Sequence, residues 1–419
     1  MTTVRRGSAA FAVAAVLAAA TAPAAVAAPS PSPSPSVALP SGLYGTGDPT
    51  YDGVWRQSLA LLAQDTVGVV PAAKAVDLLT GQQCDGGGFP SYRADVSRPC
   101  DPKLPLDTNA SAAAVQALAA LGGKDDVVAR TTGWLKSVQN EDGGWGYNPG
   151  GASDANSTSV VVGALRAAGE DPAKVTAQGG RSPLDALLTF AQPCDAKEAG
   201  AFVYQPKTPG IVADSTAAAV LAASGQGMAA TAGPEATGAA TACTDGKDLA
   251  AAARNGALYL SGALATSGHL DTAPMPGADD SSPKPDFGNT ADAVVALAAQ
   301  GMPEQAGKSL TWLQGNATAW AKETGPAAYA QLILAAHATG ADPKAFGSTD
   351  LVAGLNATGP APQSAEDASP SPSGTDGKDE KDEKKDDDSP LSTWWIVGVF
   401  FVAAVGIGFL FSGRRKNQL

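Results

Sequence analysis

The sequence has few of the residue types that build metal sites and nucleic-acid interfaces. Only two histidines, His269 and His337, occur in 419 residues, and the four cysteines form no Cys-x-x-Cys pair. Zinc sites draw on clustered Cys and His side chains, so no metal site is expected. Acidic residues outnumber basic ones by 41 to 28, and the net charge of -13 argues against nucleic acid as a partner, because phosphate backbones select basic surfaces.

The first residues have the composition of an export signal. Arg5 and Arg6 precede an apolar run over residues 9–20 and small residues up to Ala27. This order is typical of a secretory signal peptide, which we expect over residues 1–27. The paired arginines leave both the Sec and the twin-arginine route open.

The last residues have the composition of a membrane anchor. Residues 391–411 carry no charge, begin near Trp394 and Trp395, and are followed by three basic residues at 414–416. A run of this length spans the hydrocarbon core, and the basic flank marks the cytoplasmic side. The sequence therefore predicts a transmembrane helix over residues 391–412, a cytoplasmic tail over 413–419, and a single-pass protein of the cell membrane with its N-terminal part outside.

Two segments of low complexity separate these ends from a folded region. Residues 28–40 alternate Pro and Ser, and residues 358–390 pass from Pro and Ser to a charged run, so we expect a spacer and a disordered stalk. The ectodomain is then residues 41–357. Because an exported chain favours disulfides, we expect Cys84 to pair with Cys100 and Cys194 with Cys243, in preference to the other two connectivities.

Two kinds of helix alternate along the ectodomain. The first kind is small and apolar, starts near a polar residue and stops at a glycine; it is expected at residues 51–63, 109–122, 156–169, 214–225, 289–301 and 325–340. The second kind carries a bulky pair: Leu78-Leu79, Trp134-Leu135, Leu187-Leu188, Tyr259-Leu260 and Trp312-Leu313. Each of these apolar helices except the first begins near a polar residue of the N-cap type. Examples are Asn109 with Ser111, Asn156 with Ser157, Asp214 with Ser215, and Asn289 with Thr290.

The composition of the two kinds of helix predicts two layers. Apolar helices should be buried on most sides, and the more amphipathic bulky ones should cover them. We therefore predict an all-α fold, a closed α/α toroid with inner and outer helices, in preference to an open solenoid, because the bulky pairs are unevenly spaced. Residues 225–248 and 267–286 are rich in Gly, Pro, Ala and Asp and are expected to be surface loops.

The turn after the second bulky helix carries a recognisable motif. The segment from Leu135 to Trp145, with Gln139 and the pair Gly143-Gly144, resembles the Gln-Trp repeat of the prenyltransferase and squalene oxidase (terpenoid cyclase) superfamily. The resemblance covers about residues 51–340 and implies a six-fold α/α toroid, a bacterial secreted and membrane-anchored member of the superfamily. It also implies a relation in fold to cobalamin carriers, whose toroid holds a ligand without chemistry.

The enzymes of that superfamily have motifs that this chain lacks. Squalene-hopene cyclases protonate their substrate with Asp-x-Asp-Asp, whereas the nearest segment here, Asp279-Asp280, has only two acids and lies in a loop insertion. No Asp, Cys and His set matches the zinc ligands of prenyltransferases. The sequence therefore predicts no catalytic residue and requires no cofactor.

The sequence favours non-catalytic capture of a small molecule, with a cobalamin-like ligand as one candidate. Helix N-termini present unpaired N–H groups, so polar residues there could bind a ligand or simply cap the helix. Aromatic residues of the turn could stack on a ligand or plug the turn. The candidate ligand-binding residues are Asp107, Asn109, Asp154, Asn156, Asp214, Trp145 and Tyr147. A cyclase-like or glycan-acting enzyme with an unorthodox site and a structural envelope protein that binds other proteins remain the alternatives.

Overall fold

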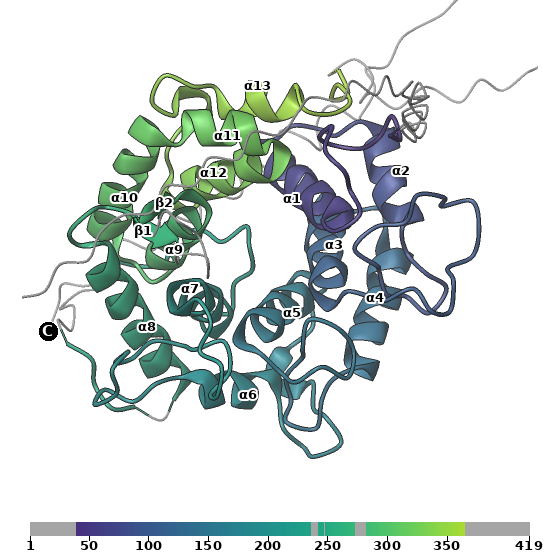
Figure 1. Cartoon of the computed structure of the whole chain (residues 1–419). Coiled ribbons are helices and arrows are strands. Elements are labelled where there is room, and N and C mark those ends of the chain that lie inside the picture. Colours follow the sequence, from purple (N-terminus) through teal and green to yellow (C-terminus); the bar gives the residue numbers. More distant parts are fainter. Residues whose placement is uncertain (1–38, 236–241, 247, 273–281, 365–419) are drawn as a thin grey trace, which may run out of the picture. The chain divides into compact units, whose positions relative to one another are not determined.

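The computed structural model describes residues 39–235, 242–246, 248–272 and 282–364. These residues are predominantly α-helical, as predicted (Figure 1). The expected signal peptide, most of the Pro/Ser spacer, the charged part of the stalk, the transmembrane helix and the basic tail lie outside the described residues. No helix formed by the described residues combines the length and the apolar character needed to cross a membrane.

The small apolar helices form a closed cycle of contacts. In the described part of the chain there are six of them: α1 (Gly53–Thr66), α3 (Thr108–Leu121), α5 (Ala155–Ala167), α7 (Val212–Ala223), α9 (Phe287–Ala299) and α12 (Pro326–Thr339). Each packs against the next in this order, and α12 packs back against α1 (Figure 1). The backbone N–H of Gly45 also donates to the carbonyl oxygen of Thr358, 2.8 Å away, which joins the two ends of the domain.

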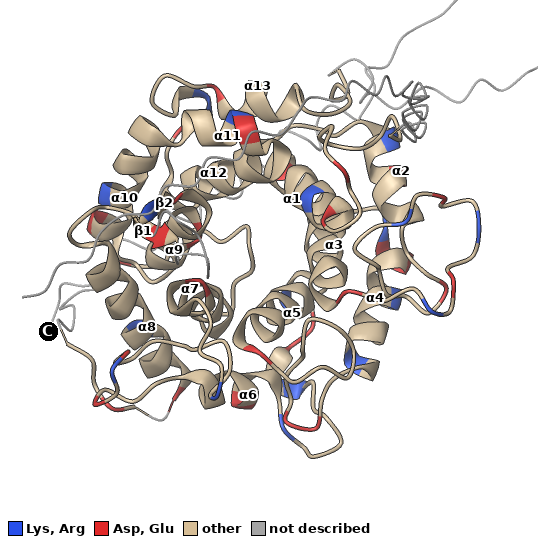
Figure 2. Ribbon diagram, viewed as in Figure 1, with Lys and Arg blue, Asp and Glu red and all other residues tan. Residues whose placement is uncertain are grey.

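The bulky helices lie outside this cycle, as their composition predicts. They are α2 (Ala73–Gly81), α4 (Asp125–Ser137), α6 (Pro183–Phe190), α8 (Leu249–Leu264) and α10 (Pro303–Asn316). Each contacts one or two inner helices, and the second member of every bulky pair except Leu188 is fully buried. Figure 2 shows Lys and Arg mainly on this outer layer and on the loops.

Several short elements were not predicted. Two short helices, α11 (Thr318–Thr324) and α13 (Leu351–Asn356), pack on α12, and two 3₁₀ turns, η1 (Pro172–Lys174) and η2 (Pro343–Ala345), follow inner helices. An antiparallel hairpin of β1 (Leu270–Thr272) and β2 (Lys284–Asp286) forms where a plain loop was expected. Packing also continues past residue 357, because Gln363 bonds to backbone groups of Val70 and Pro71.

Both expected disulfides are present. Cys84 is bonded to Cys100 and Cys194 to Cys243. The first closes the loop that leads from α2 toward α3, and the second joins the end of α6 to the segment before α8. The bonds therefore fix the turns at which the chain passes between its two layers.

Candidate functional site

Four of the turns between outer and inner helices are bonded to the inner helix that follows them. Trp145 is 1% exposed; its backbone N–H donates to Oγ1 of Thr158 over 3.1 Å, and its indole N–H donates to the carbonyl oxygen of Leu135 over 2.7 Å. The same bond from a buried residue to a hydroxyl in the first turn of the next inner helix recurs at three more turns: Phe89 to Ser111, Phe202 to Thr216 and Leu270 to Thr290. Leu270 makes this bond before α9, although it is not aromatic like the residues at the other three turns.

The residues that cap the inner helices differ from those expected. Oδ1 of Asp107 accepts from the N–H of Ala110, and the equivalent carboxylates of Asp154 and Asp286 cap α5 and α9. Asn109, Asn156 and Asn289 lie inside the first turn instead, and Asp214 lies in the first turn of α7, which has no side-chain cap. The prediction that these four residues are N-caps was therefore wrong.

This correction separates the candidate residues into two groups. Asp107 and Asp154 are almost fully buried and cap the N-termini of α3 and α5. Trp145 is buried in the turn between α4 and α5. Tyr147 is 46% exposed on the loop before α5 and does not line the cavity described below. Three candidates are brought together, Asn109, Asn156 and Asp214, which lie along the wall of a cavity enclosed by the inner helices.

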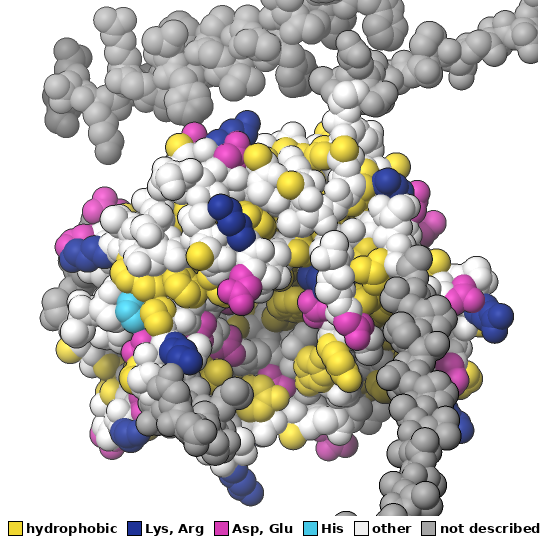
Figure 3. All heavy atoms as spheres, turned by 45° about the horizontal axis from the view of Figure 1, so that its top comes forward, with side chains coloured by type: hydrophobic (Ala, Val, Ile, Leu, Met, Phe, Trp, Pro, Cys, Tyr) yellow, Lys and Arg dark blue, Asp and Glu magenta, His cyan; other side chains and the backbone are white. Residues whose placement is uncertain are grey.

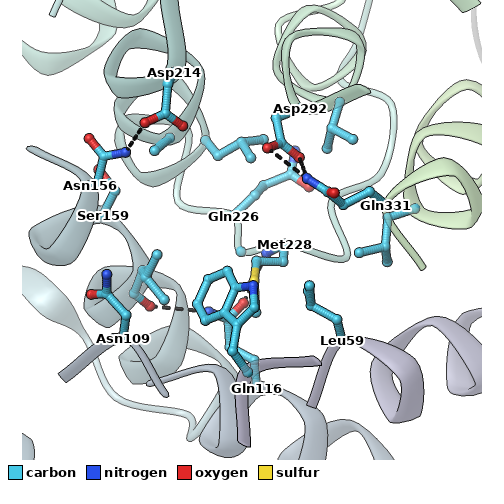
Figure 4. Close-up of a pocket in the computed structure, with 17 residues that line it drawn as sticks. Leu59, Asn109, Gln116, Asn156, Ser159, Asp214, Gln226, Met228, Asp292 and Gln331 are labelled. Atoms are coloured by element: carbon cyan, nitrogen blue, oxygen red, sulfur yellow. Dashed lines mark hydrogen bonds between the residues drawn. The ribbon is translucent and has the colours of Figure 1, made fainter. Parts of the chain in front are cut away.

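We call this cavity the cup. Its volume is about 210 Å³. It is lined by Trp55, Leu59, Asn109, Gln116, Asn156, Ser159, Val160, Asp214, Ala218, Leu221, Gln226, Gly227, Met228, Asp292, Val295, Gln331 and Leu334 (Figure 4). The space-filling view shows a hollow in the molecule with acidic and hydrophobic side chains around it (Figure 3).

Two carboxyl groups of the cup each bond to an amide. Nδ2 of Asn156 donates to Oδ2 of Asp214 over 2.5 Å, and Nε2 of Gln331 donates to the carboxylate of Asp292 over 3.2 and 3.4 Å. Figure 4 shows these as separate pairs on either side of the cavity. Asp292 and Gln331 were missed by sequence reasoning, although a lone acid in the otherwise apolar helix at 289–301 was a usable signal.

The floor of the cup is built by a segment that was expected to be a surface loop. Residues 226–228 line the cavity, and the N–H of Met228 donates to Oε1 of Gln116 over 2.9 Å. Nε2 of Gln116 donates to the carbonyl oxygen of Val160 over 3.1 Å, so this buried side chain ties α3, α5 and the loop together. The expectation of a surface loop over residues 225–248 is corrected here, because its first part is inserted among the inner helices.

The close approach of this loop requires small residues. A Cβ atom on Gly163 would lie 2.9 Å from the Cα atom of Gly227, and a Cβ atom on Gly227 would lie 2.3 Å from Oε1 of Gln116. Real Cβ atoms do not approach other atoms so closely. Glycine at both positions therefore lets the loop reach the interior and close the cup.

Burial changes the ionisation of the cup. Burial raises the pKa of Asp292 from 3.8 to about 7; the negative charge of Asp214 adds to the increase and the bond from Gln331 opposes it. Burial also raises the pKa of Asp214, against the bond from Asn156. None of the described residues that line the cup is Lys, Arg or His, so no side-chain cation balances these acids.

One residue of the cup has an acceptor atom without a partner. Oδ1 of Asn109 makes no hydrogen bond, but this atom is itself buried and does not open onto the cavity. In addition, no group of three or more His, Cys, Asp or Glu among the described residues is arranged to hold a metal ion. The cup thus has the composition of a small-molecule site, with apolar walls and a few converging polar groups.

Comparison with known proteins does not assign a family. No family model and no curated protein matches the chain. A crystal structure of a protein from Actinoplanes is similar with a TM-score of 0.46 and 16% sequence identity, over 72% of this chain and 94% of that chain. Likeness at this level says nothing about activity.

Proposed function

We propose that the protein is a membrane-tethered extracellular capture protein whose α/α toroid holds a small molecule in the cup. The observation that carries the proposal is the cup itself: the carboxyl groups of Asp214 and Asp292 and several amide side chains line a cavity between the inner helices. The cyclic packing of the inner helices supports a toroid.

The proposed location follows from the chain ends and the cysteines. Residues 1–27 as a signal peptide and 391–412 as a span would place the ectodomain outside the cell, attached to the membrane. Two disulfides suit an oxidising compartment and support this placement. The Pro/Ser and charged stalk would hold the cup away from the bilayer.

The volume of the cup limits the ligand. At about 210 Å³ it is smaller than the roughly 300–1,000 Å³ of pockets for drug-sized ligands. A cobalamin-like molecule, with its tetrapyrrole-like ring, would remain mostly outside such a cavity. We therefore propose a smaller ligand than the relation to cobalamin carriers implies.

A second candidate function, an enzyme with an unorthodox site, is favoured by one observation. A carboxyl group whose pKa is raised to about 7, as at Asp292, can donate or accept a proton near neutral pH. In this alternative Asp292 is the general acid or base for a cyclase-like or glycan-acting reaction. It predicts that Asp292→Asn abolishes turnover of a bound substrate.

The test is native mass spectrometry of the full-length protein purified in mild detergent, together with thermal shifts across a panel of small metabolites that includes cobalamin. Retention of one unchanged small molecule, lost in the variant Asn109→Ala, supports capture. Conversion of that molecule during incubation, blocked by Asp292→Asn, supports the enzyme. An apo mass without any thermal shift contradicts both and favours the third alternative, a structural envelope protein that binds other proteins.

A further inference from the structure

The carboxyl groups of the cup have acceptor positions left over. Asp214 receives one amide N–H, from Asn156, and Asp292 receives one, from Gln331, whereas a carboxylate can accept about four hydrogen bonds. Oδ1 of Asn156 is already used, since it accepts from the hydroxyl of Ser215 over 2.8 Å. A ligand that completes these groups must bring donors.

The charge of the cup also favours a ligand that carries hydrogen-bond donors. Both acids lie among described lining residues that include no Lys, Arg or His, so an anionic ligand would find no side-chain cation there. A buried acid without a cationic partner is costly in its ionised form, and a bound cation removes that cost. Ammonium and guanidinium groups carry only donors and a positive charge, which matches both requirements.

The rest of the wall selects an organic cation over an inorganic one. Leu59, Leu221, Val295 and Leu334 provide an apolar surface, and Trp55 and Met228 add an aromatic ring and a polarisable thioether. Calcium takes six or more oxygen ligands, and the described residues contain no acidic cluster arranged for a metal. An alkyl or aryl group attached to the cation would contact this wall.

We infer that the ligand of the cup is a small organic cation, an alkyl or aryl amine or guanidine whose N–H groups are bound by the carboxyl groups of Asp214 and Asp292. This inference rests on the proposed capture function and names its ligand class. The ammonium or guanidinium group supplies the positive charge that the lining residues lack, and the alkyl or aryl group of the ligand contacts the leucine and valine side chains of the wall.

Binding of a cation is coupled to the ionisation of Asp292. The groups that face this carboxyl are Asp214 from α7, Asp286 at the start of α9 and the neutral amide of Gln331 from α12. Because all charged groups among them are acids, a bound cation stabilises the ionised form and releases a proton. Affinity for the amine should therefore rise from pH 5.5 to pH 7.5.

The test compares three ligands of matched shape by titration calorimetry on the full-length protein in detergent: phenethylamine, phenethyl alcohol and phenylacetate. We expect the amine to bind at least tenfold more tightly than the alcohol, no binding of phenylacetate, and proton release measured in buffers of different ionisation enthalpy. Asp214→Asn and Asp292→Asn should each weaken amine binding at least tenfold. Asp126→Asn, on the exposed face of α4, is the matched control and should leave binding unchanged.

The outcomes distinguish this inference from the function on which it rests. Equal affinity for amine and alcohol, or unchanged amine binding in both variants, overturns the cation class. If a neutral molecule is retained by the purified protein at the same time, capture stands and only the ligand class fails. If none of the three ligands binds, the inference is wrong. If native mass spectrometry of the purified protein also shows only the apo mass, the proposed capture function is wrong as well. Circular dichroism confirms that each variant is folded.

Discussion

The variant Asp292→Asn tests the electrostatics of the cup directly, because it removes a carboxyl group and keeps its shape. Burial, and then the negative charge of Asp214, raise the pKa of Asp292 from 3.8 to about 7. Asparagine is neutral at all pH values and can still accept the N–H of Gln331. The variant therefore differs from the wild type only where the carboxyl group ionises.

The sign and size of the effect follow from linkage. Below about pH 4 the carboxyl group is protonated in the folded and the unfolded chain, so the stability it contributes is fully present. As the pH rises toward 7 the unfolded chain ionises while the folded chain holds its proton, and stability falls. A pKa change from 3.8 to about 7, at about 1.4 kcal/mol per pKa unit, gives a loss of about 4 kcal/mol of unfolding free energy.

The assay is urea unfolding of the ectodomain at pH 4, 6 and 8, followed by circular dichroism. We expect Asp292→Asn to match the wild type near pH 4 and to exceed its unfolding free energy by about 4 kcal/mol at pH 8. Asp126→Asn should follow the wild type at every pH. A constant difference between Asp292→Asn and the wild type across this range would refute the raised pKa and the burial that causes it.

Three further predictions concern the scaffold. Trp145→Ala removes a fully buried ring and its bond to a backbone oxygen, and should lower the unfolding free energy by about 3–5 kcal/mol in urea; an unchanged midpoint would contradict the role of this ring as a plug. Gly143→Ala introduces a Cβ atom at φ +89°, 2.4 Å from a backbone oxygen, and should lower the melting temperature, whereas Gly133→Ala, which meets nothing within 4 Å, should leave it equal or higher. Replacing Cys194 and Cys243 by Ser opens a link across 49 residues and should cost about 4 kcal/mol in guanidinium unfolding; insensitivity of the wild type to reductant would count against this estimate.

The layers of the fold could be predicted because they depend on local properties. An apolar helix such as residues 156–169 must be buried on most sides whatever its neighbours, and a bulky pair such as Trp134-Leu135 must face one side. The disulfides could be predicted for a similar reason, since each pair brackets one loop. The turn before α9 was not identified from the sequence because Leu270 occupies the position that Phe89, Trp145 and Phe202 hold at the other turns, although its backbone makes the same bond.

The cup could be predicted only in part. Asn109, Asn156 and Asp214 were found because polar residues near helix starts are conspicuous in apolar helices. Asn109 and Asn156 are not caps, because the caps of α3 and α5 are Asp107 and Asp154, each two residues earlier. Asp214 lies in the first turn of α7, which has no side-chain cap. Successive residues of a helix point about 100° apart. A residue that lies inside the first turn therefore points in a different direction from the cap, and Asn109, Asn156 and Asp214 line the cup instead of capping their helices.

By itself, then, the sequence determined the two layers of helices, the alternation between them and the covalent links, because each depends on composition and spacing within a few tens of residues. The tertiary structure decided which polar groups meet. Asp214 and Asp292 are far apart in sequence and face one cavity because α7 and α9 pack against each other. Gln116 bonds to Met228 only because the loop at residues 226–228 enters the space among the inner helices. Their ionisation and the ligand they select depend on that proximity, because the interaction of two charges is set by their distance and by the water between them.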